Sequence, residues 1–286
     1  MSLFEELQNL MIKYHFRPEK KLSQFFSINE ALIHFIVHNA RLQKGDVVLE
    51  IGPGTGFLTR ALCEKAKKVG AKVVAVEIDN MMFDLLSTEL KKFIDSGVLA
   101  LINGNILEQD FAALGVNKIA ALPPYHLSTE LVTKISLAKG IERAVLVMDK
   151  GFMQKLLAFE GLTEYVATTV FVNLNAKVEV LEETIEQQSF FPVPNTLSTV
   201  VLLDFHTKNN SPEFFAFLKE LFRHKNKDLG KSLKQSYQFL APKLGWKEKI
   251  FDEKLAKLAL STKKVYLLSP QEFLEVFEYF QGKEKK

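Results

Sequence analysis

The sequence predicts an α/β protein with a Rossmann-like, mostly parallel sheet, an antiparallel pair at one sheet edge, and a small all-helical C-terminal domain. Short runs rich in β-branched residues alternate with longer segments of helical periodicity from about 46 to 205. A glycine-rich segment directly follows the first of these runs. Beyond 204 a polar, turn-forming stretch begins, and only helical periods follow it.

The expected strands are short apolar runs separated by helical crossovers. In chain order they cover 47–51, 73–77, 99–102, 118–121, 144–148, a long run near 167–179, and 199–205. Apolar residues at helical spacing predict helices over 56–68 and 80–94, and another that starts at Ser128. The stiff segment 190–194 separates the last two strands, which we expect to pair antiparallel at the sheet edge.

A domain boundary is expected near 205–211, where the polar stretch 208–212 begins, and it divides the chain into 1–206 and 207–286. The distribution of charge agrees with this division. Residues 211–286 carry 16 basic and 10 acidic side chains, a balance of +6, whereas the preceding 210 residues carry 21 and 24. The net charge of +3 therefore originates in the C-terminal quarter.

Length and composition are those of an ordinary folded protein. Of the 286 residues, 47% are apolar and 25% charged, which suits one large or two unequal domains and excludes a disordered chain. No stretch approaches the roughly 18 uninterrupted apolar residues of a membrane span, and 1–14 lacks a signal-peptide profile. We therefore expect a cytoplasmic protein, with a monomer as the default and no membrane partner.

Thiol and metal chemistry are not expected. The single cysteine, Cys63, can form neither an internal disulfide nor a metal cluster, and its neighbours predict the buried side of a helix. The six histidines are scattered without the spacing of metal ligands. The sequence thus predicts no metal site.

A glycine-rich segment stands between the first expected strand and a helix. It contains Gly52, Gly54 and Gly56 and is preceded by Glu50. Glycines there let the backbone approach a ligand closely. The G-x-G-x-G spacing differs from that of dinucleotide binders, and the segment lacks the Gly-Lys-Ser/Thr ending of a phosphate-binding loop. A tight connection without a ligand is the alternative, and the segment alone does not decide between them.

A second acidic residue, Glu77, ends the next expected strand. A carboxylate at that place in an open α/β sheet can accept hydrogen bonds from both hydroxyls of a ribose. It lies within a few residues of the ~20-residue spacing expected from a glycine segment. A solvated strand end is the alternative. Together with Glu50, this residue favours a cofactor that contains a nucleoside.

The glycine segment and Glu77 resemble motifs of class I S-adenosylmethionine methyltransferases. Glu77 belongs to a V-E-I-D motif at 76–79. Five other motifs occur along the chain in the order of the family: L-S-Q-F-F at 22–26, G-N-I-L at 104–107, P-Y-H-L-S-T at 124–129, F-F-P-V-P-N at 190–195 and F-R-H-K-N-K at 222–227. They resemble the L-G-Q-N-F, G-D-A-L, P-Y-N-I-S-T, F-x-P-P-P-K and F-x-H-R-x-K segments of the rRNA adenine dimethyltransferase family of the KsgA type. The resemblance runs from about Phe16 to Phe280.

This resemblance implies an S-adenosylmethionine cofactor. The three glycines would lie against its methionine part, Glu77 would bind its ribose, Asn105 would face its adenine, and Gln24 would help close the site. The family has Asp at position 105, so Asn, which keeps an uncharged acceptor, implies weaker binding. The expected cofactor-binding residues are Gln24, Phe26, Glu50, Gly52, Gly54, Gly56, Glu77, Ile78, Asn105 and Ile106.

The resemblance also implies that an unpaired adenosine turns into the pocket and stacks on aromatic rings. Tyr125 and Phe190 match the family's aromatic positions. Stacking contributes about 1–3 kcal/mol per base, so two rings suffice. With 24 phenylalanines in the chain, a core position is the alternative for Phe190, whereas Pro192 and Pro194 favour a rigid loop at the rim.

The sequence departs from the family's N-L-P-Y motif. Alignment on Pro124 and Tyr125 places Leu122 at the Asn position, and a shift by one residue places Ala121 there. Neither side chain can hydrogen-bond the amine of adenosine, although backbone carbonyls at 122 and 123 remain. One lost polar partner costs about 2.7–4 kcal/mol, or roughly 100- to 1000-fold in rate. The expected catalytic residues are Leu122, Pro123, Pro124, Tyr125 and Phe190.

Three smaller departures accompany this one. Phe25 replaces the family's Asn or His, Ser23 replaces its Gly, and Asn195 replaces a basic residue. The cofactor segment is therefore nearly intact, whereas the base-handling segments differ. This combination suits either an altered methyltransferase or a relative that has kept the fold and lost the chemistry.

Segment 219–249 carries nine basic and three acidic residues, and phosphates are the natural counter-charge. Four of the basic residues have the spacing of one helix face. A solvated helix surface is the alternative, but 224–227 fall in the segment that resembles the family's RNA-binding segment. The expected RNA-binding residues are Arg223, His224, Lys225, Lys227, Lys231 and Lys234.

The sequence thus predicts an S-adenosylmethionine-dependent rRNA adenine-N6,N6-dimethyltransferase. Its partner would be small-subunit rRNA or the precursor of the small ribosomal subunit. Two alternatives stay open on the sequence alone: a non-catalytic rRNA-binding assembly factor, and a methyltransferase with a different substrate.

Overall fold

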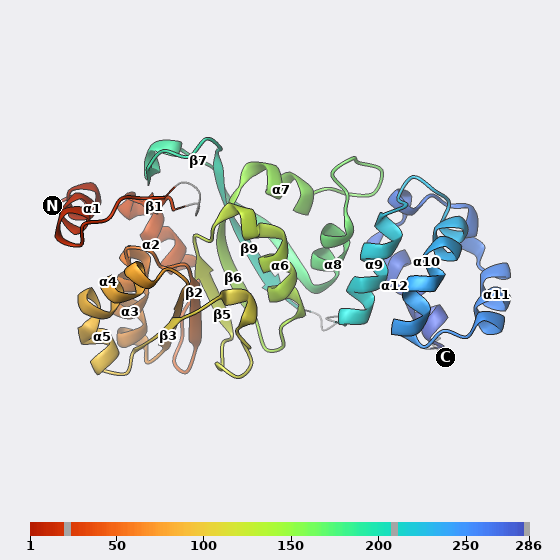
Figure 1. The fold of residues 1–286 in the computed structure, drawn as a ribbon, viewed down its shortest axis with the longest axis horizontal. Helices are drawn as coiled ribbons and strands as arrows, with labels where there is room; N and C mark the ends of the chain where they lie inside the picture. Colours follow the sequence, from red (N-terminus) through yellow and green to blue (C-terminus); the bar gives the residue numbers. More distant parts are fainter. Residues whose placement is uncertain (20–23, 207–210, 283–286) are drawn as a thin grey trace. The chain divides into compact units, whose positions relative to one another are not determined.

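The computed structural model describes residues 1–19, 24–206 and 211–282 (Figure 1). Two compact units make up the chain. The first comprises Met1–Met153 and Lys177–His206, and the second comprises Gln154–Ala176 and Thr207–Lys286. The division differs from the predicted one, 1–206 and 207–286, because 154–176 belong with the C-terminal unit.

The first unit is built on a seven-stranded sheet of strand order β4-β3-β2-β5-β6-β9-β7. The strands are β2 (Val47–Ile51), β3 (Lys72–Glu77), β4 (Leu99–Asn103), β5 (Lys118–Ala121), β6 (Arg143–Asp149), β7 (Ala176–Ile185) and β9 (Ser198–Phe205). Neighbours from β4 to β6 pair in parallel, and β9 pairs antiparallel with β6 over Ser198–Asp204. The predicted mostly parallel α/β sheet is confirmed.

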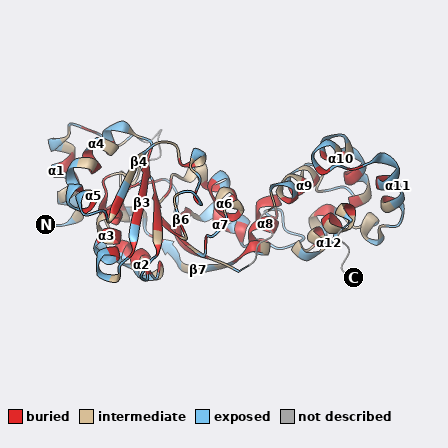
Figure 2. Ribbon diagram, turned by 90° about the horizontal axis from the view of Figure 1, so that it is seen from below, coloured by how far each residue is buried: buried red, intermediate tan, exposed pale blue. Residues whose placement is uncertain are grey.

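Helices and 3-10 turns precede or connect these strands. They are α1 (Leu3–Lys13), α2 (Glu30–Asn39), α3 (Phe57–Val69), α4 (Asn80–Glu89), α5 (Lys91–Asp95), α6 (Ser128–Leu137) and α7 (Lys150–Leu156), with turns at Ile106–Glu108, Tyr125–Leu127 and Gln187–Ser189. The central strands are buried in near-continuous runs (Figure 2), as expected for a parallel sheet that is covered on both faces.

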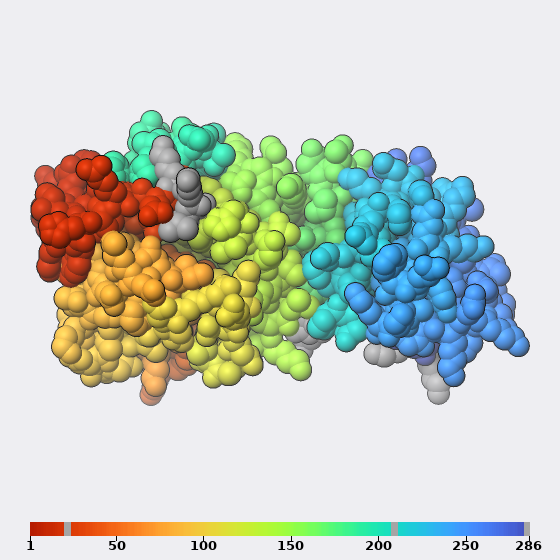
Figure 3. All heavy atoms as spheres, viewed as in Figure 1, coloured from red at the N-terminus to blue at the C-terminus, as the bar shows by residue number. Residues whose placement is uncertain are grey.

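A second, two-stranded sheet forms in the first unit. β1 (Phe26–Ser27) pairs antiparallel with β8 (Phe190–Phe191), with Phe26 opposite Phe191 and Ser27 opposite Phe190. Nearby, the ring of Phe4 on α1 packs edge-on against the ring of Phe191, with 5.5 Å between the ring centroids. The N-terminal segment and the segment around β8 adjoin in the space-filling view (Figure 3). The sequence did not predict this pairing, which joins two motifs that lie far apart along the chain.

The predicted strand near 167–179 is wrong in its first part. Residues Ala167–Asn175 form helix α8, and only from Ala176 does the chain become β7. The β-branched composition favours a strand, but side-chain hydrogen bonds hold the helical form: Asn173 Nδ2 donates to the carbonyls of Leu156 and Thr169 at 3.1 and 2.9 Å.

Burial against other helices also explains α8. Its residues are almost all buried, and it packs against α9 (Pro212–Phe222) and α12 (Pro270–Gln281) of the C-terminal unit. The Phe171 ring lies 5.0 Å from that of Phe215 and 6.2 Å from that of Phe214. This packing places 154–176 in the second unit and overrides the local propensity.

The second unit is helical, as predicted. Besides α8, α9 and α12 it contains α10 (Leu229–Leu244), α11 (Glu248–Ala256) and 3-10 turns at Ala259–Thr262 and Val265–Leu267. Aromatic rings fill its interior, and Trp246 contacts the rings of Phe217, Phe251 and Phe280 at 5.1–6.3 Å. Within the described ranges of both units, no helix combines the length and apolar character needed to cross a membrane.

A substitution at Gly56, the residue before α3, would show how closely the start of α3 packs against α4. Its φ is +81°, and a Cβ there would lie 2.7 Å from Leu86 Cδ2 and 3.2 Å from Leu90 Cδ1. We expect Gly56→Ala to lower the free energy of unfolding by about 2–4 kcal/mol, from backbone strain and overpacking together. Urea denaturation would measure the loss.

Gly97→Ala is the matched control. Gly97 also has a positive φ, +71°, but no atom lies within 4 Å of the added Cβ. Its cost should be the backbone term alone, roughly 1–2 kcal/mol. Equal losses for the two variants would show that α4 does not constrain Gly56.

Candidate functional site

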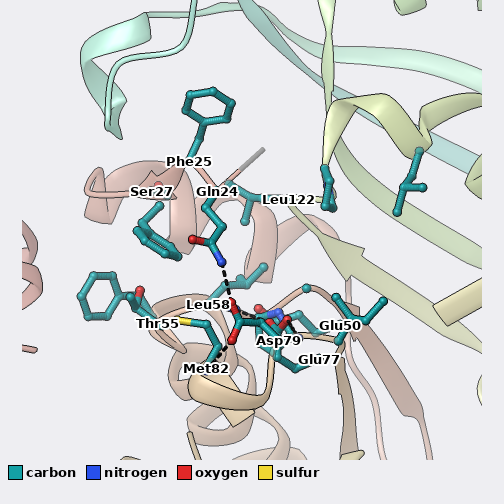
Figure 4. Close-up of a pocket in the computed structure, with 18 of the residues that line it drawn as sticks. Gln24, Phe25, Ser27, Glu50, Thr55, Leu58, Glu77, Asp79, Met82 and Leu122 are labelled. Carbon is teal, nitrogen blue, oxygen red and sulfur yellow. Dashed lines mark hydrogen bonds between the residues drawn. The ribbon is translucent and has the colours of Figure 1, made fainter. Parts of the chain in front are cut away.

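A cavity of about 310 Å³ opens at the carboxyl ends of β2, β3 and β5 (Figure 4). β2 pairs with β3 on one side and with β5 on the other, so the strand order reverses there. Ligands of open α/β sheets bind at such a reversal. Ten predicted site residues line the cavity: Gln24, Phe26, Glu50, Gly52, Gly54, Glu77, Ile78, Asn105, Leu122 and Pro124.

Five predicted residues lie outside its lining: Gly56, Ile106, Pro123, Tyr125 and Phe190. Gly56 precedes α3 and packs toward α4, and Ile106 is only 5% exposed. Phe190 is 2% exposed because its strand β8 pairs with β1. The lining also includes residues that the sequence analysis did not select, among them Phe25, Ser27, Leu58, Asp79, Met82 and His126.

Glu77 joins the two loops that border the cavity. One carboxyl oxygen, Oε2, accepts a hydrogen bond from the Gly54 N–H at 3.0 Å, and Oε1 accepts one from the Asp79 N–H at 2.9 Å. Burial raises the pKa of the Glu77 carboxyl, and these N–H donors oppose the rise. A carboxyl group offers about four acceptor positions, so Glu77 can also accept from a ligand.

Asp79 extends this network across the cavity. Its Oδ1 accepts from the backbone N–H groups of Met81 and Met82 at 2.8 and 3.2 Å and so caps α4. Its Oδ2 accepts from Gln24 Nε2 at 2.8 Å, as Figure 4 shows. The bond holds Gln24 beside Asp79 at the edge of the cavity. Asp79 belongs to the V-E-I-D motif, so its place after Glu77 was the available signal.

Glu50 is a buried acid with one oxygen unpartnered within the described part of the chain. It is 2% exposed, and among the described residues its Oε2 has no hydrogen-bond partner. Burial raises the pKa of the Glu50 carboxyl to about 8, and the nearby charge of Glu77 adds to the rise. A buried acid that lines a cavity in this way is suited to a cationic ligand.

The glycine segment must lack side chains for the cavity to have this shape. Gly54 has a φ of +56°, and a Cβ there would lie 2.8 Å from Phe26 Cε1. The Phe26 ring therefore lies directly on the Gly54 backbone. Gly52, with a φ of +63°, faces Pro124 across 3.6 Å. The bare backbone of the glycine segment thus lies between the Phe26 ring and Pro124 at the cavity.

Asn105 precedes the turn at Ile106–Glu108. Its Oδ1 accepts from the Leu107 N–H at 3.0 Å, and its Nδ2 donates to Glu108 Oε1 at 3.2 Å. An amide oxygen has two lone pairs. One lone pair of Oδ1 therefore stays available to a hydrogen-bond donor in the cavity.

The opposite side of the cavity is apolar and aromatic. Leu122 follows β5 and lines the cavity together with Pro124 and the ring of Phe25. Tyr125 begins the next turn, outside the lining, and its hydroxyl hydrogen-bonds Ser198 Oγ. Burial raises the pKa of the Tyr125 hydroxyl. The Tyr125 ring lies 6.3 Å from that of Phe25, with 18° between the ring planes.

The basic residues of the second unit do not share one helix face, contrary to prediction. α9 ends at Phe222 and α10 begins at Leu229, so 223–227 form the turn between them. Several of the predicted residues bind local acceptors: Arg223 pairs with Glu220, Lys231 with Asp228, Lys227 with Gln235 and Lys225 with the Thr163 carbonyl. Lys234 is exposed on α10.

Metal ligation has no support in the described ranges 1–19, 24–206 and 211–282. No three His, Cys, Asp or Glu side chains there are grouped as ligands for an ion.

Comparisons with known proteins show which family the chain is similar to. A family model described as ribosomal RNA adenine dimethylase matches residues 15–281. A probable ribosomal RNA small subunit methyltransferase A of Methanopyrus kandleri is 34% identical over 82% of this chain and 82% of its own length. One of the same name from Thermococcus gammatolerans is 32% identical over 97% and 94%.

Among solved structures, a dimethyladenosine transferase from Plasmodium falciparum is similar with a TM-score of 0.71 and 25% sequence identity. The match covers 89% of this chain and 97% of that one.

Glu50 makes stability depend on pH. Between about pH 4.5 and pH 8 the unfolded chain has released this proton, whereas the folded chain retains it. The free energy of unfolding therefore falls as pH rises, by up to about 1.4 kcal/mol per pH unit. Glu50→Gln has no proton to release, so its stability relative to the wild type should rise across this window. Urea unfolding at several pH values would measure the difference, and a pH-independent difference would contradict the raised pKa.

Proposed function

The chain belongs to the ribosomal RNA adenine dimethylase family, and from this premise we propose that it transfers methyl groups from S-adenosylmethionine to the exocyclic amine of adenosines in small-subunit rRNA. One observation carries the proposal. A single cavity has buried acids and bare glycine backbone on one side, and on the other the ring of Phe25, which stacks on Tyr125. A cationic nucleoside cofactor fits the first side, and a flat base fits the second.

The residues present fit S-adenosylmethionine. Glu50, with its unpartnered buried oxygen, suits the ammonium group of the methionine part. Glu77 has lone pairs for the ribose hydroxyls, and Asn105 has one for the adenine amine. Ile78 is 67% exposed at the cavity and offers an apolar surface to the adenine ring. When bound, the cofactor supplies a methyl group activated by the sulfonium charge.

The proposed reaction requires little acid–base chemistry from the protein. The amine nitrogen of adenosine forms a bond to the methyl carbon while the carbon–sulfur bond breaks, and the nitrogen then loses a proton to solvent. The contribution of the protein is to position the amine and to stabilise charge that develops on it.

Leu122 gives the amine less electrostatic stabilisation than a hydrogen-bonding side chain at the same position would. Its side chain lines the cavity but cannot accept a hydrogen bond from the amine. The backbone carbonyls of Leu122 and Pro123 are the acceptors left at this place, and the rings of Pro123 and Pro124 restrict the backbone that carries them. We infer that transfer is slower than with an asparagine at this position.

We also propose that the turn 223–227 and the start of α10 contact RNA phosphates through Arg223, His224, Lys225, Lys227, Lys231 and Lys234. The basic balance of the C-terminal quarter supports this. Cytoplasmic location and a monomeric state stay predictions from the sequence.

Transfer of labelled methyl groups to undermethylated small ribosomal subunits tests the proposed function. The digested RNA would be examined for mono- and dimethyladenosine, with an active enzyme on the same subunits as control. Label in dimethyladenosine is the expected result. No label, together with a working control, would favour a non-catalytic assembly factor.

Placing an asparagine side chain at position 122, as in the N-L-P-Y motif of the family, should accelerate methyl transfer. Leu122→Asn is expected to raise kcat at least tenfold, because an oriented acceptor at the reacting amine contributes about 2.7–4 kcal/mol. Leu122→Ala is the control, since it changes the same side chain without adding an acceptor. A fall in turnover for Leu122→Asn would show that position 122 does not face the amine.

Phosphate contacts can be counted from salt dependence. Lys234→Gln should reduce the slope of log affinity for RNA against log salt by roughly 0.7–0.9, as for one lost phosphate contact. Lys257→Gln is the control, because Lys257 is an exposed lysine of the same unit at the end of α11. Equal slopes for Lys234→Gln and the wild type would remove Lys234 from the proposed surface.

A further inference from the structure

We propose that Phe25 contacts the target adenosine, and that its ring acts together with Tyr125 in the place that the sequence analysis gave to Phe190. This inference rests on the proposed function, since it names a residue that holds the base during methyl transfer. It assigns a role to a position where the resembling family has Asn or His.

The position of Phe25 is the first reason. Its side chain is half-buried and lines the cavity. Figure 4 shows its ring on the side opposite to the carboxyl groups of Glu50, Glu77 and Asp79. Phe25 therefore lies where a second ligand would enter beside a cofactor held by those acids.

The orientation of its ring is the second reason. The rings of Phe25 and Tyr125 are nearly parallel, with 18° between their planes and 6.3 Å between their centroids. Two aromatic faces of similar direction suit a flat base, and every base has a π-face on which such rings can stack. Leu122 also lines this cavity, so a base stacked there can bring its amine to the backbone carbonyls at 122 and 123.

Phe190 cannot take this role in the described structure. It is 2% exposed and belongs to the hydrophobic core. Tyr125 also lies outside the cavity lining, but it is only half-buried and its ring stacks on Phe25, which does line the cavity. The strand of Phe190 is hydrogen-bonded to β1, with Phe190 opposite Ser27. Exposing the Phe190 ring to a base would require breaking this pair and opening the core.

The backbone on both sides of Phe25 is held in place. Before it, Gln24 donates to Asp79 at 2.8 Å and accepts from the Glu19 N–H at 2.9 Å. After it, Phe26 pairs with Phe191 in the two-stranded sheet. Because the backbone is already ordered, little conformational entropy is lost when the ring binds a base. Stacking then provides positioning that the missing amide at 122 does not.

Two substitutions at this position provide the test. Phe25→Leu keeps apolar bulk and removes the ring, whereas Phe25→Tyr keeps the ring. Methyl transfer to undermethylated small subunits should show a kcat/KM at least fivefold lower for Phe25→Leu and within about twofold of the wild type for Phe25→Tyr. The Kd for S-adenosylmethionine should be unchanged in both. Phe239→Leu, which removes a 57% exposed ring from α10, is the matched control.

A second readout does not depend on turnover. An RNA hairpin with 2-aminopurine at an unpaired loop position loses fluorescence when that base stacks on a ring. Quenching on binding should be present for the wild type and for Phe25→Tyr, and reduced for Phe25→Leu at equal RNA occupancy.

The outcomes separate the two proposals. Wild-type kcat/KM and quenching in Phe25→Leu would overturn the role of Phe25, as would a loss of cofactor affinity equal to the loss of kcat/KM. If the wild type transfers no methyl group while a control enzyme does, the proposed function fails, and the quenching data alone decide whether Phe25 contacts a base.

Discussion

The carboxyl group of Glu77 is the point on which the site depends. It ends β3 and binds the backbone of the glycine segment through Gly54 and the start of α4 through Asp79. Asp79 in turn holds Gln24, so three segments distant in sequence meet around two neighbouring acids. Burying a carboxylate is costly, and the N–H donors at the loop ends offset that cost. These hydrogen bonds therefore hold the three segments together around the acidic wall of the cavity.

The two sides of the cavity are made by different means. On the acidic side, hydrogen bonds between loops hold Glu77, Asp79 and Gln24, whereas one oxygen of Glu50 has no partner among the described residues. On the aromatic side, packing and ring contacts of Phe25 and Tyr125 define the surface. Changes on the second side can alter how a base is held without disturbing how a cofactor is held. The sequence shows this asymmetry, since the family's cofactor motifs are nearly intact while Leu122 and Phe25 depart from its pattern.

Local pattern was enough to predict the parallel strands and the glycine segment, because buried parallel strands are continuous β-branched runs and strand–turn–helix units are short. Local pattern failed to predict the structure where contacts between residues far apart in the sequence determine it. Helix α8 forms because α9 and α12 bury it. The importance of Asp79 depends on Gln24, and that of Phe25 on Tyr125, in each case a partner dozens of residues away. Likewise, only the pairing of β8 with β1 shows that Phe190 is buried.

The placement of β9 has a consequence for synthesis of the chain. β9 lies between β6 and β7 and pairs with β6 over Ser198–Asp204, and β8 pairs with β1, whose Phe26 and Ser27 line the cavity. A nascent chain that ends before 190 can pair β2 to β6 in parallel, but it leaves the β6 edge open and β1 without its partner. Such an edge invites association with other chains. The interval between emergence of β6 and of β9 is thus the period in which the growing protein most needs protection.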